Sequence, residues 1–123
     1  MLKILSFAND GDGSAGRNFV YHTSDFYINA SRTALRVRDA KKLSLKYVLL
    51  SIADMKQKYG FSYTHKANKQ NLAAVRFKVP SDGNGALDID AQLAVVEQFD
   101  LVEQIKSELR NKLDTFVMQR IKY

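Results

Sequence analysis

The sequence predicts an α+β fold, with a small mixed β-sheet domain, one packed helix and a long C-terminal helix. Two observations predict it. In the first third of the chain, short aromatic and β-branched stretches are separated by turn-forming residues, which is typical of a small sheet. From about residue 90 onward, apolar residues recur every three or four positions, which is the period of an amphipathic helix. We therefore expect a domain over residues 1–86 and a helical arm over residues 87–123.

The sheet is predicted to consist of short strands. Apolar, aromatic and β-branched residues predict strands over the ranges 2–8, 18–22, 26–28 and 33–38. Between the first two, residues 9–16 are dense in aspartate, glycine and serine, which turn the chain. In the fourth strand, alternation places Ala34, Arg36 and Arg38 on one face. We therefore expect one face of the sheet to be basic.

A helix is predicted to follow these strands. Ser44 is a suitable N-cap and Gly60 a suitable stop, and apolar residues recur at helical spacing between them. Asn68 is suited to cap a brief helical turn. Residues 75–79 then predict one more strand, closed by the single proline, and residues 81–85 have the composition of a loop.

The C-terminal helix is predicted by a stripe of apolar residues, namely Leu93, Val96, Phe99, Val102, Ile105, Leu109, Leu113 and Phe116. Asp88 or Asp90 is suited to cap it. A helix of roughly 30 residues spans about 45 Å, which is longer than a domain of this size covers. Part of the stripe is therefore expected to pair with another helix. Lysines and an arginine interrupt a strict heptad, so a bundle helix and a coiled-coil helix both remain open.

Charge is distributed unevenly along the chain. The net charge is +6, but residues 1–80 carry 14 lysines and arginines against 5 acidic residues, whereas residues 81–123 carry 5 against 8. A basic body is expected to bind a polyanion, and an acidic helical tail is expected to bind protein. A solvated basic surface is the alternative explanation.

Residue content argues against several functions. Cysteine is absent, which excludes disulfides, thiolate zinc sites and a cysteine nucleophile. The two histidines lack partner ligands at a useful spacing, so we expect neither a metal site nor a catalytic set. The longest apolar run has four residues, far below the roughly 18 that a membrane helix needs. The apolar N-terminal stretch is too short for a signal peptide, so a cytoplasmic location is expected.

One glycine-rich motif resembles a cofactor loop. Residues Gly11 to Gly16 match the dinucleotide-binding pattern G-x-G-x-x-G. Such a loop leads into a helix that holds the phosphate, whereas residues 18–22 are strand-prone. The run also begins like a calcium loop, but Ala15 stands where glycine is needed and Tyr21 where a glutamate belongs. We therefore expect a hairpin turn that binds no cofactor.

Residues 56–71 interleave aromatic rings, cations and amides. Lysine and arginine contact phosphates, whereas asparagine, glutamine and arginine have the geometry to hydrogen-bond base edges. The alternative is a surface loop that Tyr59 and Phe61 anchor in the core. For residues 63–69 we favour contact with nucleic acid.

Several phrases follow one another in this part of the chain: Lys-Tyr-Gly-Phe-Ser-Tyr-Thr-His-Lys-Ala-Asn (58–68), Leu72, Val-Arg-Phe-Lys-Val-Pro (75–80), Asp-Gly-Asn-Gly (82–85) and Leu-Asp-Ile-Asp (87–90). Their order and spacing resemble the close of a target recognition domain from restriction-modification systems. The similar domains are those of type I specificity (S) subunits and the recognition modules of type IIB and IIG enzymes. The resemblance covers nearly the whole chain and is strongest over residues 58–90.

This resemblance implies a non-catalytic DNA reader without a cofactor or metal, formed by a partial recognition domain (1–86) and a spacer helix (87–123). It implies three kinds of partner: double-stranded DNA, methyltransferase (modification) subunits and restriction subunits. A homodimer through the C-terminal helix is a further option, and no membrane is expected as a partner. By position, the residues expected to face DNA are Arg17, Asn18, Tyr63, His65, Lys66, Asn68 and Lys69.

Two departures from the family pattern matter. The family domain normally has more chain before the equivalent of Leu2, and an S subunit usually carries two such domains, so the chain resembles a fragment or a reduced half. The alternative hypothesis is a protein-interaction domain, such as an assembly or anti-restriction partner, whose basic face binds an acidic protein. A third hypothesis, a small methyl-donor enzyme, requires cofactor binding.

Overall fold

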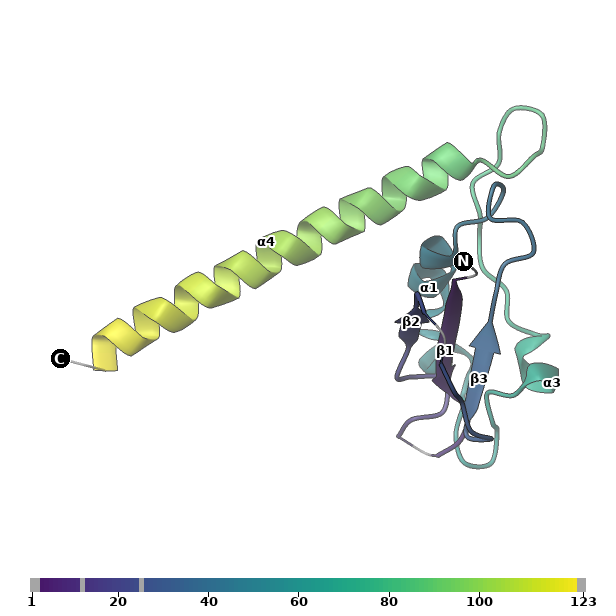
Figure 1. Ribbon diagram of the computed structural model, residues 1–123, viewed down its shortest axis with the longest axis horizontal. Coiled ribbons are helices and arrows are strands. Elements are labelled where there is room, and N and C mark those ends of the chain that lie inside the picture. Colours follow the sequence, from purple (N-terminus) through teal and green to yellow (C-terminus); the bar gives the residue numbers. More distant parts are fainter. Residues whose placement is uncertain (1–2, 12, 25, 122–123) are drawn as a thin grey trace.

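The computed structural model describes residues 3–11, 13–24 and 26–121. It shows a small α+β body from which one long helix projects, so that the C-terminal end lies far from the body (Figure 1). The predicted α+β class is therefore confirmed. In the described part of the chain, no helix has both the length and the apolar content needed to cross a membrane.

The sheet has three strands, β1 (Ile4–Ala8), β2 (Val20–His22) and β3 (Arg32–Leu35). β1 lies between the other two and pairs antiparallel with both. Leu5 is thus opposite Tyr21 on one side and opposite Leu35 on the other. Three of the four strands predicted before the first helix are confirmed, although they are shorter than expected; the start of the first predicted strand, residue 2, lies outside the described residues.

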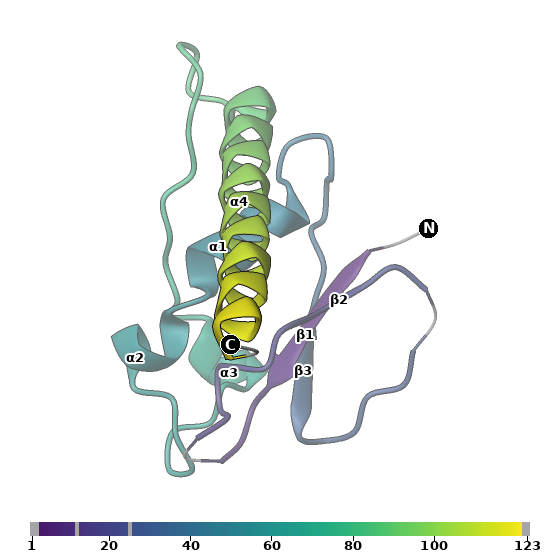
Figure 2. The ribbon, with the colours of Figure 1, turned by 90° about the vertical axis from the view of Figure 1, so that its left-hand side faces the viewer.

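The core lies on one face of this sheet. Successive side chains of a strand point to opposite faces, and both Leu5 and Phe7 are fully buried. They contact two helices on that face, α1 (Leu45–Ile52) and α2 (Met55–Tyr59) (Figure 2). The buried cluster consists of Leu5, Phe7, Ala15, Leu45, Val48, Ile52, Met55, Phe61 and Ala67.

α1 and α2 correspond to the single helix that the sequence predicts. The predicted ends are confirmed: the Ser44 hydroxyl accepts a hydrogen bond from the Tyr47 N–H at 3.3 Å, and Gly60 ends α2 with φ at +70°. The prediction of one continuous helix is wrong, because Asp54 takes a non-helical backbone conformation at the N-cap position of α2. Aspartate is unfavourable inside helices, although the Asp54 side chain makes no capping hydrogen bond to α2. The break still leaves Ile52 and Met55 both in the core.

The predicted strand at 26–28 is not formed. Instead the Phe26 ring stacks on His22, with 3.6 Å between ring centroids, and Tyr27 is fully exposed. Strand propensity measures how well a side chain fits a half-buried pleated surface. Here the aromatic ring covers a neighbouring strand without extending the ladder.

The predicted strand at 75–79 is also not formed, although the proline does follow it. Hydrogen bonds to tyrosine hydroxyls take the place of the expected hydrogen bonds to a neighbouring strand. The Tyr59 hydroxyl accepts from the Arg76 N–H at 2.8 Å and donates to the Arg76 carbonyl at 3.0 Å. The Tyr47 hydroxyl donates to the Lys78 carbonyl at 2.9 Å. The segment is therefore held by side chains of α1 and α2.

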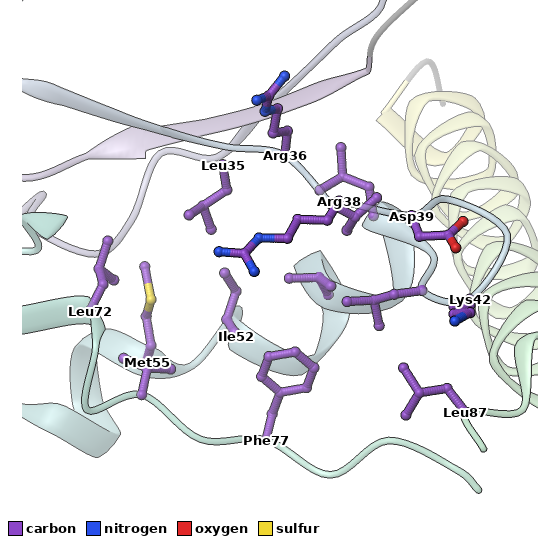
Figure 3. A pocket seen from close by; sticks show the side chains of 15 residues that line it. Leu35, Arg36, Arg38, Asp39, Lys42, Ile52, Met55, Leu72, Phe77 and Leu87 are labelled. Atoms are coloured by element: carbon purple, nitrogen blue, oxygen red, sulfur yellow. The ribbon is translucent and has the colours of Figure 1, made fainter.

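The predicted strand at 33–38 is too long. β3 begins one residue earlier and ends at Leu35, and the chain continues through Arg36 and Arg38 outside the ladder. Ala34 and Arg36 are exposed, whereas Leu35 and Val37 are half-buried against the core. The predicted alternation therefore holds as far as Val37, and Arg38 does not continue it, since its side chain and that of Arg36 point in different directions (Figure 3).

Two caps predicted from the sequence are confirmed. α3 (Lys69–Leu72) begins where the Asn68 side chain accepts from the Asn71 N–H at 2.9 Å. α4 (Ile89–Ile121) begins where the Asp88 carboxylate accepts from the Ala91 N–H at 3.0 Å. The predicted loop at 81–85 lies between them and is closed by an antiparallel bridge between Ser81 and Leu87.

Only the start of α4 is fixed to the body. Gln92 is fully buried; its Oε1 accepts from the Ser44 N–H at 2.8 Å, and its Nε2 donates to the Lys42 carbonyl at 2.9 Å. Val96 is also buried. From residue 97 to residue 120, every side chain is exposed, including the apolar ones. The predicted stripe is therefore uncovered over most of its length.

Candidate nucleic-acid interface

The first part of the candidate interface is the turn after β1. The Ala8 N–H donates to the Arg17 carbonyl at 2.9 Å, and the Gly16 N–H donates to the Ala8 carbonyl at 2.8 Å. The chain then enters β2 and not a helix, so the predicted hairpin turn is confirmed. Asp12, which belongs to this motif, lies outside the described residues. Arg17 and Asn18 leave the turn with exposed side chains.

Gly16 explains why this turn needs glycine. Its φ is +78°, and a Cβ added there would lie 2.9 Å from the Phe61 ring and 3.3 Å from the Lys56 backbone. L-residues with a side chain rarely adopt this conformation, and the space is already filled. The turn is therefore packed directly against the bend that contains Phe61.

That bend, residues 61–68, is the second part of the candidate interface. Phe61 is buried, and the His65 ring stacks on it with 5.3 Å between centroids. Ser62 and His65 exchange backbone hydrogen bonds of 2.9 and 3.2 Å, which closes a tight turn. Tyr63 lies in this turn and is 64% exposed. The stack holds the exposed His65 ring in place beside this hydrogen-bonded turn.

Ala67 joins the two parts. Its side chain is fully buried, its N–H donates to the Asn9 carbonyl at 2.8 Å, and its carbonyl accepts from the Thr33 hydroxyl at 2.9 Å. Asn9 in turn donates through its side chain to the Ala30 carbonyl at 3.0 Å. The turn after β1, the start of β3 and the bend at 61–68 therefore meet at one end of the sheet, away from the start of α4 (Figure 1).

An ion pair crosses this junction. The Lys66 Nζ lies 3.3 Å from the Asp10 carboxylate, and both side chains are partly exposed. Asn68 is half-buried and caps α3, and Lys69 follows it with an exposed side chain. The structure thus brings the predicted bend residues near the predicted turn residues, on a surface that solvent reaches.

Arg32 is a basic residue at this junction that the sequence analysis did not select. Its guanidinium donates to the Asn18 carbonyl and, at 3.1 and 3.3 Å, to the Ser6 hydroxyl. The period-two alternation that places Ala34, Arg36 and Arg38 on one face includes Arg32 when it is extended by one step. That alternation was the signal that could have identified it.

Ser6 and His22 lie as close together as a catalytic nucleophile and its base, but a substrate cannot reach the serine. The Ser6 Oγ lies 2.7 Å from the His22 Nε2, yet Ser6 is fully buried, and its oxygen also accepts from Arg32. A substrate cannot reach a buried oxygen. The cluster instead ties the three strands together. Among the described residues, no three histidine or acidic side chains gather closely enough to hold a metal ion.

The chain matches no protein-family model, no curated protein and no solved structure in comparisons with each of these groups.

Proposed function

We propose that this protein is the DNA sequence recognition module of a restriction-modification complex, a non-catalytic target recognition domain that directs methyltransferase and endonuclease subunits to a target site. One observation carries the proposal: Ala67 holds two loops, more than 40 residues apart in the chain, at one end of a basic body. In this proposal, methyl transfer and cleavage belong to partner subunits, and the complex acts in the cytoplasm.

The exposed side chains divide into two roles. Arg17 and Lys69 are exposed cations that form no ion pair within the described part of the chain, and they are suited to contact phosphates. Asn68 uses its Oδ1 for the cap, which leaves its Nδ2 to donate to a base edge in the major groove. Lys66 must exchange Asp10 for a phosphate, because its ion pair occupies it in this structure.

α4 is proposed to bind protein. Its exposed apolar side chains include Phe99, Ile105 and Leu113, each about half exposed at 45%, 48% and 62%. Residues 89–104 carry four acidic side chains and no basic one, whereas residues 105–121 carry four basic and two acidic ones. An antiparallel second copy would place opposite charges side by side, and a methyltransferase subunit is the other proposed partner.

The test is to co-express the full chain with methyltransferase subunits, map the modified bases and measure binding to the modified sequence at several salt concentrations. Replacing Lys69 with Ala is expected to weaken binding to all duplexes and to flatten the salt slope by about one unit, because each lost phosphate contact releases one counterion fewer. Lys41→Ala is the matched control, since Lys41 is exposed outside both loops.

Lys66 needs a second control because of its ion pair. Lys66→Ala removes both the cation and the bond to Asp10, whereas Asp10→Asn removes only the ion pair. If Lys66 contacts phosphate, the first change weakens DNA binding and the second strengthens it or leaves it unchanged. An unchanged affinity and salt slope for both lysine variants would contradict the proposed interface.

The exposed stripe of α4 favours a second candidate, a protein-interaction domain whose basic face binds an acidic protein. Competition separates the two functions. A DNA reader prefers its own site over scrambled duplex at equal salt, whereas a basic protein-binding domain shows the same salt-dependent affinity for both.

A further inference from the structure

An apolar groove opens between β3, α1 and the extended segment 75–79. Its volume is about 480 Å³. Figure 3 shows Leu35 and Leu72 on its walls, with Ile52, Met55 and Phe77 pointing into it. Ile52 and Met55 also belong to the buried cluster, so the groove leads directly to the core. Ala67, Asn9 and Thr33, which form the junction described above, do not line this groove.

One wall of the groove is the edge of the sheet. Within the described residues, β3 pairs only with β1. The Asn9 N–H donates to the Ser31 carbonyl, and two positions further along, Phe7 is opposite Thr33. Because hydrogen-bonded and non-hydrogen-bonded pairs alternate in an antiparallel ladder, the backbone groups of Ala34 point away from β1. They offer a donor and an acceptor to another strand.

A cation lies across the groove. Figure 3 shows the Arg38 side chain extending over the apolar floor toward Ile52, whereas Arg36 points away from it. Across residues 3–11, 13–24 and 26–121, Arg38 makes no hydrogen bond or ion pair. Arg36, Arg38 and Lys42 line the groove together with one acidic side chain, Asp39, so the lining is net basic. Exposed guanidinium groups favour carboxylate partners.

We propose that the groove binds an extended segment of a partner polypeptide in which apolar and acidic side chains alternate. The segment adds to β3 as a further strand and hydrogen-bonds to the backbone of Ala34. Its apolar side chains enter the groove over Ile52 and Phe77, and its carboxylates, which point to the opposite face of the strand, pair with Arg36, the guanidinium that points away from the groove floor (Figure 3). A strand fits better than a helix because a helix has already used its backbone groups internally and has none to give to the edge of β3.

The probe is a synthetic eight-residue peptide of alternating valine and glutamate with both ends blocked. Its binding to the full chain is measured by fluorescence anisotropy, and the contacted residues are located from amide chemical-shift changes. We expect shifts at Ala34 and Arg36. A peptide of the same composition, with four valines followed by four glutamates, is expected to bind at least tenfold more weakly because it cannot place apolar and acidic groups on opposite faces.

Charge reversal tests the role of Arg36. Arg36→Glu is expected to weaken binding of the valine–glutamate peptide at least tenfold and to favour a valine–lysine peptide of the same pattern. Lys41→Glu makes the same change of charge outside the groove and is expected to alter affinity less than twofold. Circular dichroism of each variant verifies that the fold is intact.

Three results would overturn the proposal: equal binding of the alternating and block peptides, equal effects of the two charge reversals, or shifts that spare Ala34. Decanoate is tested in parallel. Binding of decanoate with no binding of the alternating peptide would assign the groove to a small amphipathic carboxylate and would also refute the proposal.

Discussion

Replacing Gln92 with Ala is expected to lower the free energy of unfolding by about 2–3 kcal/mol. The truncation leaves two backbone groups without their partner, the Ser44 N–H and the Lys42 carbonyl. An unsatisfied buried group costs about 1–3 kcal/mol, and the lower part of that range applies to each because Ser44 is half-buried and Lys42 is exposed. The loss is a large fraction of the total of about 5–15 kcal/mol that is typical of a domain.

Urea unfolding measures this loss. With a slope of about 1–3 kcal/mol per molar urea, the midpoint is expected to fall by about 1 M or more. Gln98→Ala is the matched control, since Gln98 is an exposed glutamine on the same helix, and its replacement is expected to change stability by less than about 0.5 kcal/mol. Gln92→Glu keeps the acceptor for Ser44 but loses the donor to Lys42 and buries a charge, so it is expected to be no more stable than Gln92→Ala.

Equal, small changes in the free energy of unfolding for Gln92→Ala and Gln98→Ala would refute this prediction. In that case the two hydrogen bonds would not be what fixes α4 to the body, and the buried amide would be replaceable by water.

Three further outcomes are expected. Gly16→Ala destabilises the protein by about 2–4 kcal/mol, because φ is positive and Phe61 fills the space, whereas Gly13→Ala, where nothing lies within 4 Å, has little effect; equal midpoints in thermal unfolding would contradict this. Tyr59→Phe costs about 1 kcal/mol and speeds hydrogen exchange of the Arg76 amide, whereas unchanged exchange would show that the hydroxyl is dispensable. Asn68→Asp keeps the cap of α3, so stability by urea unfolding stays within about 0.5 kcal/mol while one position of a DNA site selection relaxes; full retention of sequence preference would exclude a base contact by Asn68.

The features that sequence predicts best are those that few neighbouring residues decide. The caps at Ser44, Asn68 and Asp88 and the stop at Gly60 follow from side chains within four residues of the backbone groups that they satisfy. Tertiary contacts decided the features that the sequence analysis predicted wrongly. Residues 75–79 have the composition of a strand, but their backbone groups hydrogen-bond to tyrosine side chains of α1 and α2 and not to another strand.

The candidate interface divides in the same way. Composition alone selects the bend that contains His65 and Lys66, because rings, cations and amides alternate there. That this bend lies against the turn after β1 depends on the contact between Ala67 and Asn9, which no local pattern encodes. Arg32 lies on the sequence alternation of residues 34–38, but its contacts with Ser6 of β1 and with the Asn18 carbonyl follow only from the tertiary structure.

The attachment of α4 through Gln92 makes the helix a lever arm. About 29 residues extend beyond that glutamine, which corresponds to about 44 Å at 1.5 Å per residue. A tilt of about 10° at the pivot would therefore sweep the far tip through about 8 Å by simple trigonometry on that length. A partner bound at the tip would therefore be displaced by several ångströms when the body rotates slightly, and two buried side chains of α4, Gln92 and Val96, determine how stiffly the helix is held.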